Sequence, residues 1–275
     1  MRLSVIVPTK NRPREVLSCL ASIFEHSPQV EEVIVVDQSA TAYALPDEPR
    51  LVHLYRPDLS GLTAARNAGV EVSHGELILF MDDDCLFRSD VVAETIAAFD
   101  ANPDVVGVQA RLADQNYNPP PISSRVFEHG FFDVNDFGPD DDMRRTAGAG
   151  CAFRRSLFDR ERFDDQGLYG YCYGEDYDFS VRARRLGRLM RIPQAVVEHC
   201  ASMNNRFDRR RSFETRWKNL NYIYAKQRAQ TAPADRIWHL WWMFGETLQW
   251  LRFGFGLPRS PESRVSGRAG SRTAA

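Results

Sequence analysis

Short apolar runs rich in β-branched residues alternate with helical patterns over the first hundred residues, and this alternation limits the fold more than any other feature. The predicted strands occupy residues 3–7, 32–36, 51–55 and 77–81, and the predicted helices occupy residues 13–25, 61–72 and 89–102. Several strands are apolar at successive positions, which is typical of strands buried on both faces. The sequence therefore predicts an α/β fold with a Rossmann-like, mostly parallel central sheet and helices on both faces.

Polar side chains collect where these predicted strands end. Residues 8–12 follow the first strand, residues 37–39 follow the second, and residues 82–84 follow the fourth. Open α/β sheets bind ligands outside the carboxyl ends of their strands. We therefore expect a binding site at this edge of the sheet.

The three consecutive aspartates Asp82, Asp83 and Asp84 are the strongest local signal in the chain. Carboxylates this close repel one another, so a fold that fixes them at a strand end normally supplies a compensating cation. Hard oxygen ligands of this kind suit Mg²⁺ or Mn²⁺. The structural alternative is a solvated loop whose aspartates cap the following helix.

Two further positions in the first half could contact a nucleotide. Asp37 ends the second strand, where an acid can accept hydrogen bonds from a base or a ribose, although it could equally be a turn former. Arg66 and Asn67 lie on a helix of small residues that can sit close to the sheet. The Arg66 guanidinium suits a diphosphate or a carboxylate, and its alternative is a surface arginine on an amphipathic helix.

A second acidic pair, Glu175 and Asp176, lies among glycine and tyrosine residues at the start of a predicted helix. An aromatic setting can raise the proton affinity of a carboxylate, as a general base requires. The alternative is a pair of helix caps. His199 follows a β-like run, and a lone histidine there is more often structural than a ligand.

The order of the remaining chain is less regular. Residues 112–145 form a long excursion with three consecutive prolines, which is typical of a lid or binding loop. Regular patterns resume in 146–205 and include two short β runs near 189–192 and 195–199. A helical pattern occupies 206–257, and residues 258–275 are predicted to be a disordered tail. We expect a catalytic domain in 1–205, divided into halves of about 1–111 and 146–205, followed by the helical extension.

The net charge of the chain changes sign at the predicted boundary between residues 205 and 206. Residues 206–275 hold 14 basic and 5 acidic residues, a net charge of +9, which leaves 21 basic and 32 acidic residues in 1–205, a net charge of −11. The segment 206–257 also holds aromatic residues at helical spacing, including four tryptophans within 238–250. A basic, aromatic, amphipathic helix suits an anionic membrane surface better than nucleic acid. The alternative is a helical pair packed on the catalytic domain or on a second subunit.

Cysteine usage and the N-terminus favour a reducing, cytoplasmic location. The five cysteines are an odd number without a C-x-x-C pair, which argues against a disulfide framework and a structural zinc site. The first apolar run is too short for a signal peptide and is closed by Pro8. Polar residues interrupt the apolar stretch 238–257, so it is not predicted to span a membrane. We expect a cytoplasmic protein, peripheral on the inner face of the cell membrane.

Five of these elements in order resemble a family 2 glycosyltransferase of the GT-A fold. They are the segments 5–12 and 33–39, the Ala-Ala-Arg-Asn-Ala-Gly run of 64–69, the strand 77–81 with its aspartates, and Gly174 with the acidic pair. The resemblance covers about residues 1–200. It implies an inverting hexosyltransferase that moves a sugar from a nucleotide-diphosphate sugar to a hydroxyl acceptor, a glycan or a lipid-linked saccharide.

The resemblance also implies a role for each residue. The donor would be held by Pro8, Thr9, Asn11, Arg12, Asp37, Ser39, Arg66, Asn67, Asp82, Asp83 and Gly150. Mg²⁺ or Mn²⁺ would be bound by Asp84, Asp82 and His199. Asp176 would be the catalytic base, with Glu175 beside it contacting the acceptor or orienting the site.

Two other functions remain open at this point. A sugar-phosphate nucleotidyltransferase has a related sheet, but it usually carries a glycine-rich loop where this chain has residues 8–12. A non-catalytic nucleotide-sugar-binding partner of a membrane assembly is the second alternative, and the retained acids Asp84 and Asp176 argue against it. The sequence does not name the donor base, the sugar or the acceptor.

Overall fold

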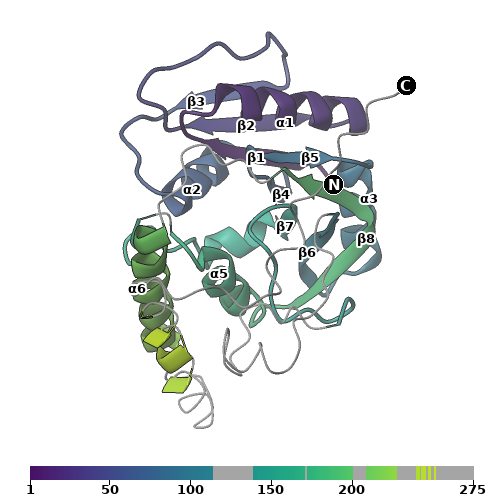
Figure 1. The fold of residues 1–275 in the computed structure, drawn as a ribbon. Helices are drawn as coiled ribbons and strands as arrows, with labels where there is room; N and C mark the ends of the chain where they lie inside the picture. The colour runs from purple at the N-terminus through teal and green to yellow at the C-terminus, as the bar shows by residue number, and fades with distance from the viewer. Residues whose placement is uncertain are drawn as a thin grey trace, which may run out of the picture. The chain divides into compact units, whose positions relative to one another are not determined.

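A computed structural model of the chain describes residues 1–113, 139–170, 172–200 and 209–227, and parts of 240–251. It contains one eight-stranded sheet in the order β3-β2-β1-β4-β7-β6-β8-β5, with helices packed around it (Figure 1). The strands are β1 (Leu3–Thr9), β2 (Glu32–Asp37), β3 (Leu51–Tyr55), β4 (Leu77–Phe80), β5 (Cys85–Phe87), β6 (Val105–Leu112), β7 (Cys151–Arg154) and β8 (Arg188–His199). The helices are α1 (Pro13–His26), α2 (Leu62–Val72), α3 (Val91–Ala101), the 3₁₀ turn η1 (Arg155–Asp159), α5 (Glu175–Ala183) and α6 (Arg209–Gln227).

The sheet confirms the predicted α/β class and is parallel in its first half. Strands β3, β2, β1 and β4 pair in parallel, as their buried apolar runs predict. The second half is mixed, because β7 pairs antiparallel with both β4 and β6, and β5 pairs antiparallel with β8. The short strand β5 begins directly after the three aspartates and has no counterpart in the sequence prediction.

Two predicted local features differ from the structure. The β runs expected near 189–192 and 195–199 form one strand, β8, whose pairing with β6 shifts register near Pro193 because proline cannot donate a ladder hydrogen bond. Helix α3 was expected to begin at Ser89, but its N-cap is Asp90, whose carboxylate accepts the Ala93 amide at 3.1 Å. The Ser89 hydroxyl instead accepts the Val196 amide at 2.8 Å and fastens β8.

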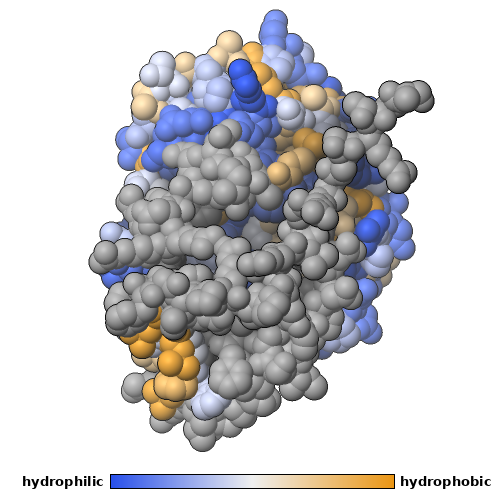
Figure 2. All heavy atoms as spheres, viewed as in Figure 1, coloured by the Kyte–Doolittle hydropathy of each residue, from blue (hydrophilic) through white to orange (hydrophobic). Residues whose placement is uncertain are grey.

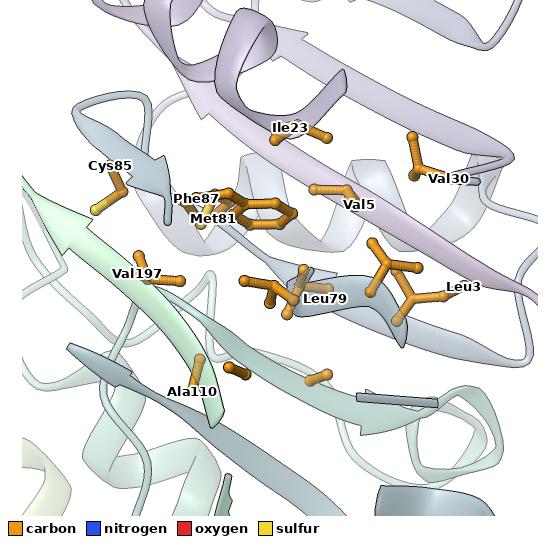
Figure 3. Packing of buried hydrophobic residues seen from close by; sticks show 14 of the residues in the cluster. Leu3, Val5, Ile23, Val30, Leu79, Met81, Cys85, Phe87, Ala110 and Val197 are labelled. Carbon is orange, nitrogen blue, oxygen red and sulfur yellow. The ribbon is translucent and has the colours of Figure 1, made fainter. Parts of the chain in front are cut away.

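Two buried clusters hold the sheet between its helices. One lies against α1 and α3 and includes Val5, Ile23, Leu79, Phe87 and Val197 (Figure 3). The other lies against α2 and α5 and contains a group of packed rings: Phe80, Phe153, Phe163 and Phe179. Burying an aromatic or large aliphatic side chain stabilises a fold by about 1.5–3 kcal/mol, so these clusters fix the strand ends firmly.

Helix α6 packs on the body that carries the sheet. Residues 1–119 and 133–231 form one compact unit, which therefore extends past the predicted boundary at 205. Lys226 lies 3.0 Å from the buried carboxylate of Asp178 in α5, and Asn219 bonds the backbone of Tyr169 and Tyr173. This part of the basic extension matches the alternative expectation of a helix packed on the catalytic domain. Residues 114–138, most of the excursion, and 258–275 lie outside the described residues.

Candidate active site

The three aspartates lie between β4 and β5, and each meets a different partner. Asp83 is buried and accepts hydrogen bonds from the Thr9 hydroxyl and from an Arg12 guanidinium nitrogen, both at 2.8 Å. The Tyr43 hydroxyl extends this chain by donating to Thr9 at 3.2 Å. Burial raises the pKa of Asp83 to about 6, although Arg12 and Thr9 oppose the rise. Residues of the first strand end therefore hold the central aspartate.

Asp84 faces the end of β8 across the sheet edge. Its carboxylate lies 3.3 Å from Nε2 of His199 and 3.4 Å from Arg12, and its carbonyl accepts the Cys200 amide at 2.8 Å. Ligand atoms of Asp84, Cys85 and His199 all lie within 4.8 Å of one another. A carboxylate and an imidazole this close fit Mn²⁺ or Mg²⁺, whose remaining positions can be filled by phosphate oxygens and water. Among the described residues, Asp82, which the resemblance also implied as a metal ligand, does not belong to the group formed by Asp84, Cys85 and His199.

Asp82 instead contacts Arg66, which links it to the second acidic pair. The Arg66 guanidinium lies 3.3 Å from the Asp82 carboxylate and 3.0 Å from Glu175, and donates to the Gly148 carbonyl at 2.7 Å. Its side chain is only 1% exposed and lies over the ring of Phe163. The two acidic groups, about ninety residues apart in the chain, therefore share one buried cation.

Glu175 and Asp176 begin α5 after Gly174, which has the left-handed φ of 89° that glycine tolerates best. Burial raises the pKa of Glu175 to about 8, and the neighbouring Asp176 adds to the rise while Arg66 opposes it. The Asp176 side chain is more exposed, at 23%, and one of its oxygens lies 3.5 Å from Arg145. Asp176 is thus the more solvent-accessible acid of the pair.

The two strand-end loops predicted to hold the nucleotide are tied together. The Asp37 carboxylate accepts the Ser39 amide at 2.8 Å and lies 3.2 Å from Nε2 of His53 in β3. The Asn11 backbone amide donates to the Ser39 hydroxyl at 2.7 Å, and the Asn11 side-chain oxygen accepts the Ala40 backbone amide at 3.2 Å. Asn11 itself has a φ of 57°, a conformation that asparagine adopts more readily than most residues. Pro8, Thr9, Asn11, Asp37 and Ser39 are therefore brought to one edge.

Gly150 is held in the approach to β7 by a residue that sequence reasoning missed. The Gln109 side chain donates to the carbonyl of Ala149 at 2.9 Å and accepts the amide of Ala147 at 2.7 Å. Gly150 has a φ of 68° and bonds the Phe80 carbonyl at 2.8 Å. A single glutamine inside an apolar run was the available signal. Arg12 as a partner of Asp83 and Arg145 as a partner of Asp176 were missed in the same way.

Asn67 was predicted to be a site residue, but its side chain contacts the loop before α5. Its amide group exchanges hydrogen bonds with the backbone of Phe163 at 2.9 and 3.1 Å and donates to Asp165 at 3.0 Å. These bonds connect α2 to the loop before α5. They join Asn67 to none of the acidic residues discussed above.

A family model described as glycosyl transferase family 2 matches residues 4–162, which is more than half of the chain. The chain belongs to glycosyl transferase family 2. The match spans the end of β1, helix α2 with Arg66, and the three aspartates, and it confirms the resemblance seen in the sequence. This family 2 member is therefore a glycosyltransferase.

Two relatives illustrate what the family 2 chain is similar to. The uncharacterized glycosyltransferase YwdF of Bacillus subtilis is 28% identical over 212 residues, covering 74% of this chain and 75% of that protein. The glucosyl-dolichyl phosphate glucuronosyltransferase of Haloferax volcanii is 26% identical over 215 residues, covering 72% of this chain and 65% of that protein. The second name gives that protein a lipid-linked substrate.

Two solved structures establish the GT-A fold. A mannosyltransferase of Pyrobaculum calidifontis, in complex with GDP-mannose and Mn²⁺, has a TM-score of 0.61 at 20% identity and covers 95% of this chain and 77% of its own. The S. aureus protein TarS (residues 1–349), in complex with UDP-GlcNAc, has a TM-score of 0.52 at 19% identity and covers 82% and 73%. Within the described part of this family 2 chain, no helix is both long and apolar enough to cross a bilayer.

Proposed function

We propose that this glycosyltransferase is a metal-dependent, inverting enzyme that moves a sugar from a nucleotide-diphosphate sugar to an acceptor hydroxyl. The contact of Arg66 with both Asp82 and Glu175 carries this proposal, because it supports a single site containing the aspartates and the acidic pair. The Mn²⁺ and nucleotide sugars bound by the two structural relatives support the same chemistry.

Asp176 is the proposed general base. Its accessible carboxylate takes the proton from the acceptor hydroxyl while that oxygen attacks the anomeric carbon. Attack opposite the leaving diphosphate inverts the anomeric configuration. Glu175 is buried against Arg66 and orients the start of α5, so it positions Asp176.

The donor would lie along the edge formed by the strand ends. Asp37, with Asn11 and Ser39 in the interlocked loops, would hold the base and ribose. Asp84 and His199 would hold a divalent cation, which when bound stabilises negative charge on the leaving diphosphate. Arg66 is only 1% exposed and contacts both Asp82 and Glu175, which supports a positioning role. Its direct contact with a diphosphate, the role implied by the resemblance, stays a prediction.

The acceptor is proposed to be a glycan or a lipid-linked saccharide presented at an anionic membrane surface. The substrate named for the Haloferax relative supports a lipid-linked acceptor. The basic, aromatic composition of 206–257 supports the membrane surface. Apolar side chains gather on the helical segment 240–251 (Figure 2), where Leu240 is 65% exposed and Phe244 is 53% exposed.

Nucleotide release from a donor panel tests the proposed function. Purified full-length protein is incubated with Mn²⁺ or Mg²⁺ and UDP-, GDP- or dTDP-sugars, and the released nucleotide is identified. We expect nucleoside diphosphate from one donor class, and a kcat lower by about 10²–10⁴-fold in Asp176→Asn with donor binding retained. Asp58→Asn, a change at an exposed acid, is the matched control and leaves release unchanged.

The alternatives give different results in the same experiment. Pyrophosphate as the released product would identify a nucleotidyltransferase. Donor binding without turnover, in both the wild type and Asp176→Asn, would identify a non-catalytic nucleotide-sugar-binding protein. Either result overturns the proposed function.

A further inference from the structure

Cys85 lies beside the proposed metal ligands and has no role in the proposed transfer. It is the first residue of β5, directly after Asp84, and pairs with His199 of β8 in an antiparallel ladder. Residues opposite one another in such a ladder point to the same face, with Cβ atoms about 4.5–5.5 Å apart. The thiol therefore lies near the His199 imidazole because of the strand register.

The Cys85 thiol also differs from the other buried thiols in its hydrogen bonding. Three other buried cysteines contact an oxygen: Cys19 bonds the Asp82 carbonyl at 3.7 Å, Cys151 the Gly148 carbonyl at 3.8 Å, and Cys172 lies 3.3 Å from the Thr63 hydroxyl. Among the described residues, no hydrogen bond to the Cys85 thiol is found, although its side chain is fully buried. Cys85 belongs to the same buried cluster as Met81 and Phe87, and Figure 3 shows its sulfur directed away from both.

We propose that Asp84, Cys85 and His199 form a three-ligand site that binds Zn²⁺ and Co²⁺ more tightly than Mn²⁺ or Mg²⁺. The ligand atoms lie within 4.8 Å of one another, so a small closing movement of the side chains would bring all three within bonding distance of one ion. Affinity for nitrogen, oxygen and sulfur ligands rises from Mn²⁺ to Co²⁺, and a soft thiolate ligand selects Zn²⁺ over the hard ions Mn²⁺ and Mg²⁺. On binding, the metal–sulfur bond forms and the thiol proton passes to solvent.

The proposed site changes what a bound ion can do. Three protein ligands leave a tetrahedral Zn²⁺ one open position, whereas an octahedral Mn²⁺ held by Asp84 and His199 alone keeps several for phosphate oxygens. Zn²⁺ is therefore expected to displace Mn²⁺ and inhibit transfer. This inhibition depends on the proposed function, whereas the binding of the ion to Cys85 does not.

Co²⁺ titration of the full chain tests the ligand directly. A cobalt–thiolate bond gives a charge-transfer band in the near ultraviolet, which we expect in the wild type and expect Zn²⁺ to abolish. Cys85→Ser should lose this band. Its Zn²⁺ affinity, measured by competition, should fall by at least about 10–100-fold, which is the loss seen when a group that only hydrogen-bonds to a metal ligand is removed. Cys85→Ala and circular dichroism check that any loss is not unfolding.

Cys200→Ser is the matched control, because Cys200 is exposed and follows His199 directly. It should keep the band. A wild type without the band, a band that persists in folded Cys85→Ser, or a band lost in Cys200→Ser would each overturn the proposal. Mn²⁺-dependent nucleotide release is measured separately in the wild type. Release without a cobalt band contradicts this inference alone, and a band without release contradicts the proposed function alone.

Discussion

Glu175 and Asp176 are neighbours in the chain but have different surroundings. Glu175 is buried against Arg66, and burial together with Asp176 raises its pKa from the usual 4.5 to about 8. The folded protein therefore keeps a proton on Glu175 that the unfolded chain loses above pH 4.5. Because the native state binds more protons in this window, Glu175 makes the free energy of unfolding fall as the pH rises from about 4.5 to about 8.

Glu175→Gln should remove this part of the pH dependence. One proton gives a slope of at most about 1.4 kcal/mol per pH unit. Urea unfolding at several pH values across the window measures it, and the stability of the variant should improve relative to the wild type as the pH rises. Glu94→Gln, at an acid in the first turn of α3, serves as the control. Parallel curves for wild type and Glu175→Gln would contradict the prediction.

Helix α2 places Arg66 because small residues let it approach the sheet. A Cβ atom added at Gly69 would lie 2.5 Å from Cγ2 of Ile6, a fully buried residue of β1. Gly69 lies three residues after Arg66 and so on the same side of the helix. Any displacement of α2 from the sheet therefore moves the guanidinium relative to Asp82 and Glu175.

Gly69→Ala should destabilise the protein and lower transfer together. Alanine gains about 1 kcal/mol in helix propensity, but overpacking a filled core costs about 1–3 kcal/mol, and here the contact is with a branched, buried side chain. Urea unfolding and the rate of nucleotide release measure the two effects. Val72→Ala, at an exposed position in the last turn of α2, should change neither by much. An unchanged rate in Gly69→Ala would mean that Arg66 tolerates displacement.

At the scale of the whole molecule, the basic C-terminal part should bind anionic membranes. Full-length protein is expected to sediment with vesicles that contain anionic lipid and to be released by salt, because screening weakens the attraction. Phe244→Glu with Leu248→Glu should weaken binding by more than about tenfold, since each residue loses about 1.5–3 kcal/mol of burial. Leu186→Glu, at an exposed leucine in the sheet-bearing unit, is the control.

A different outcome would support the alternative partner of this segment. If the double substitution changes the oligomeric state and leaves vesicle binding intact, the exposed residues contact a second subunit. The substitutions are placed outside helix α6, because Lys226 of that helix is already paired with Asp164 and Asp178. Basic residues on that helix are thus not all available to lipid headgroups.

The sequence by itself determined the α/β class, the order of the first strands and helices, and the edge where the strand-end candidate acids lie. These features are local: the period of apolar residues marks each element, and a polar residue after a buried run marks a strand end. The acids at 37 and 82–84 could be chosen on that basis, whereas the pair at 175–176 was chosen from its glycine and tyrosine neighbours at a predicted helix start. The family match supports the fold that the strand pattern implies.

The tertiary structure alone decided which polar side chains contact one another. Arg12 pairs with Asp83, Arg66 joins Asp82 to Glu175, and the register of β5 with β8 sets Cys85 beside His199. Each contact joins residues from separate elements, and most join residues more than seventy positions apart, through a mixed sheet in which β7 lies between β4 and β6. Strand pairing over such separations depends on the whole core, because local propensity does not specify which distant strand becomes the neighbour.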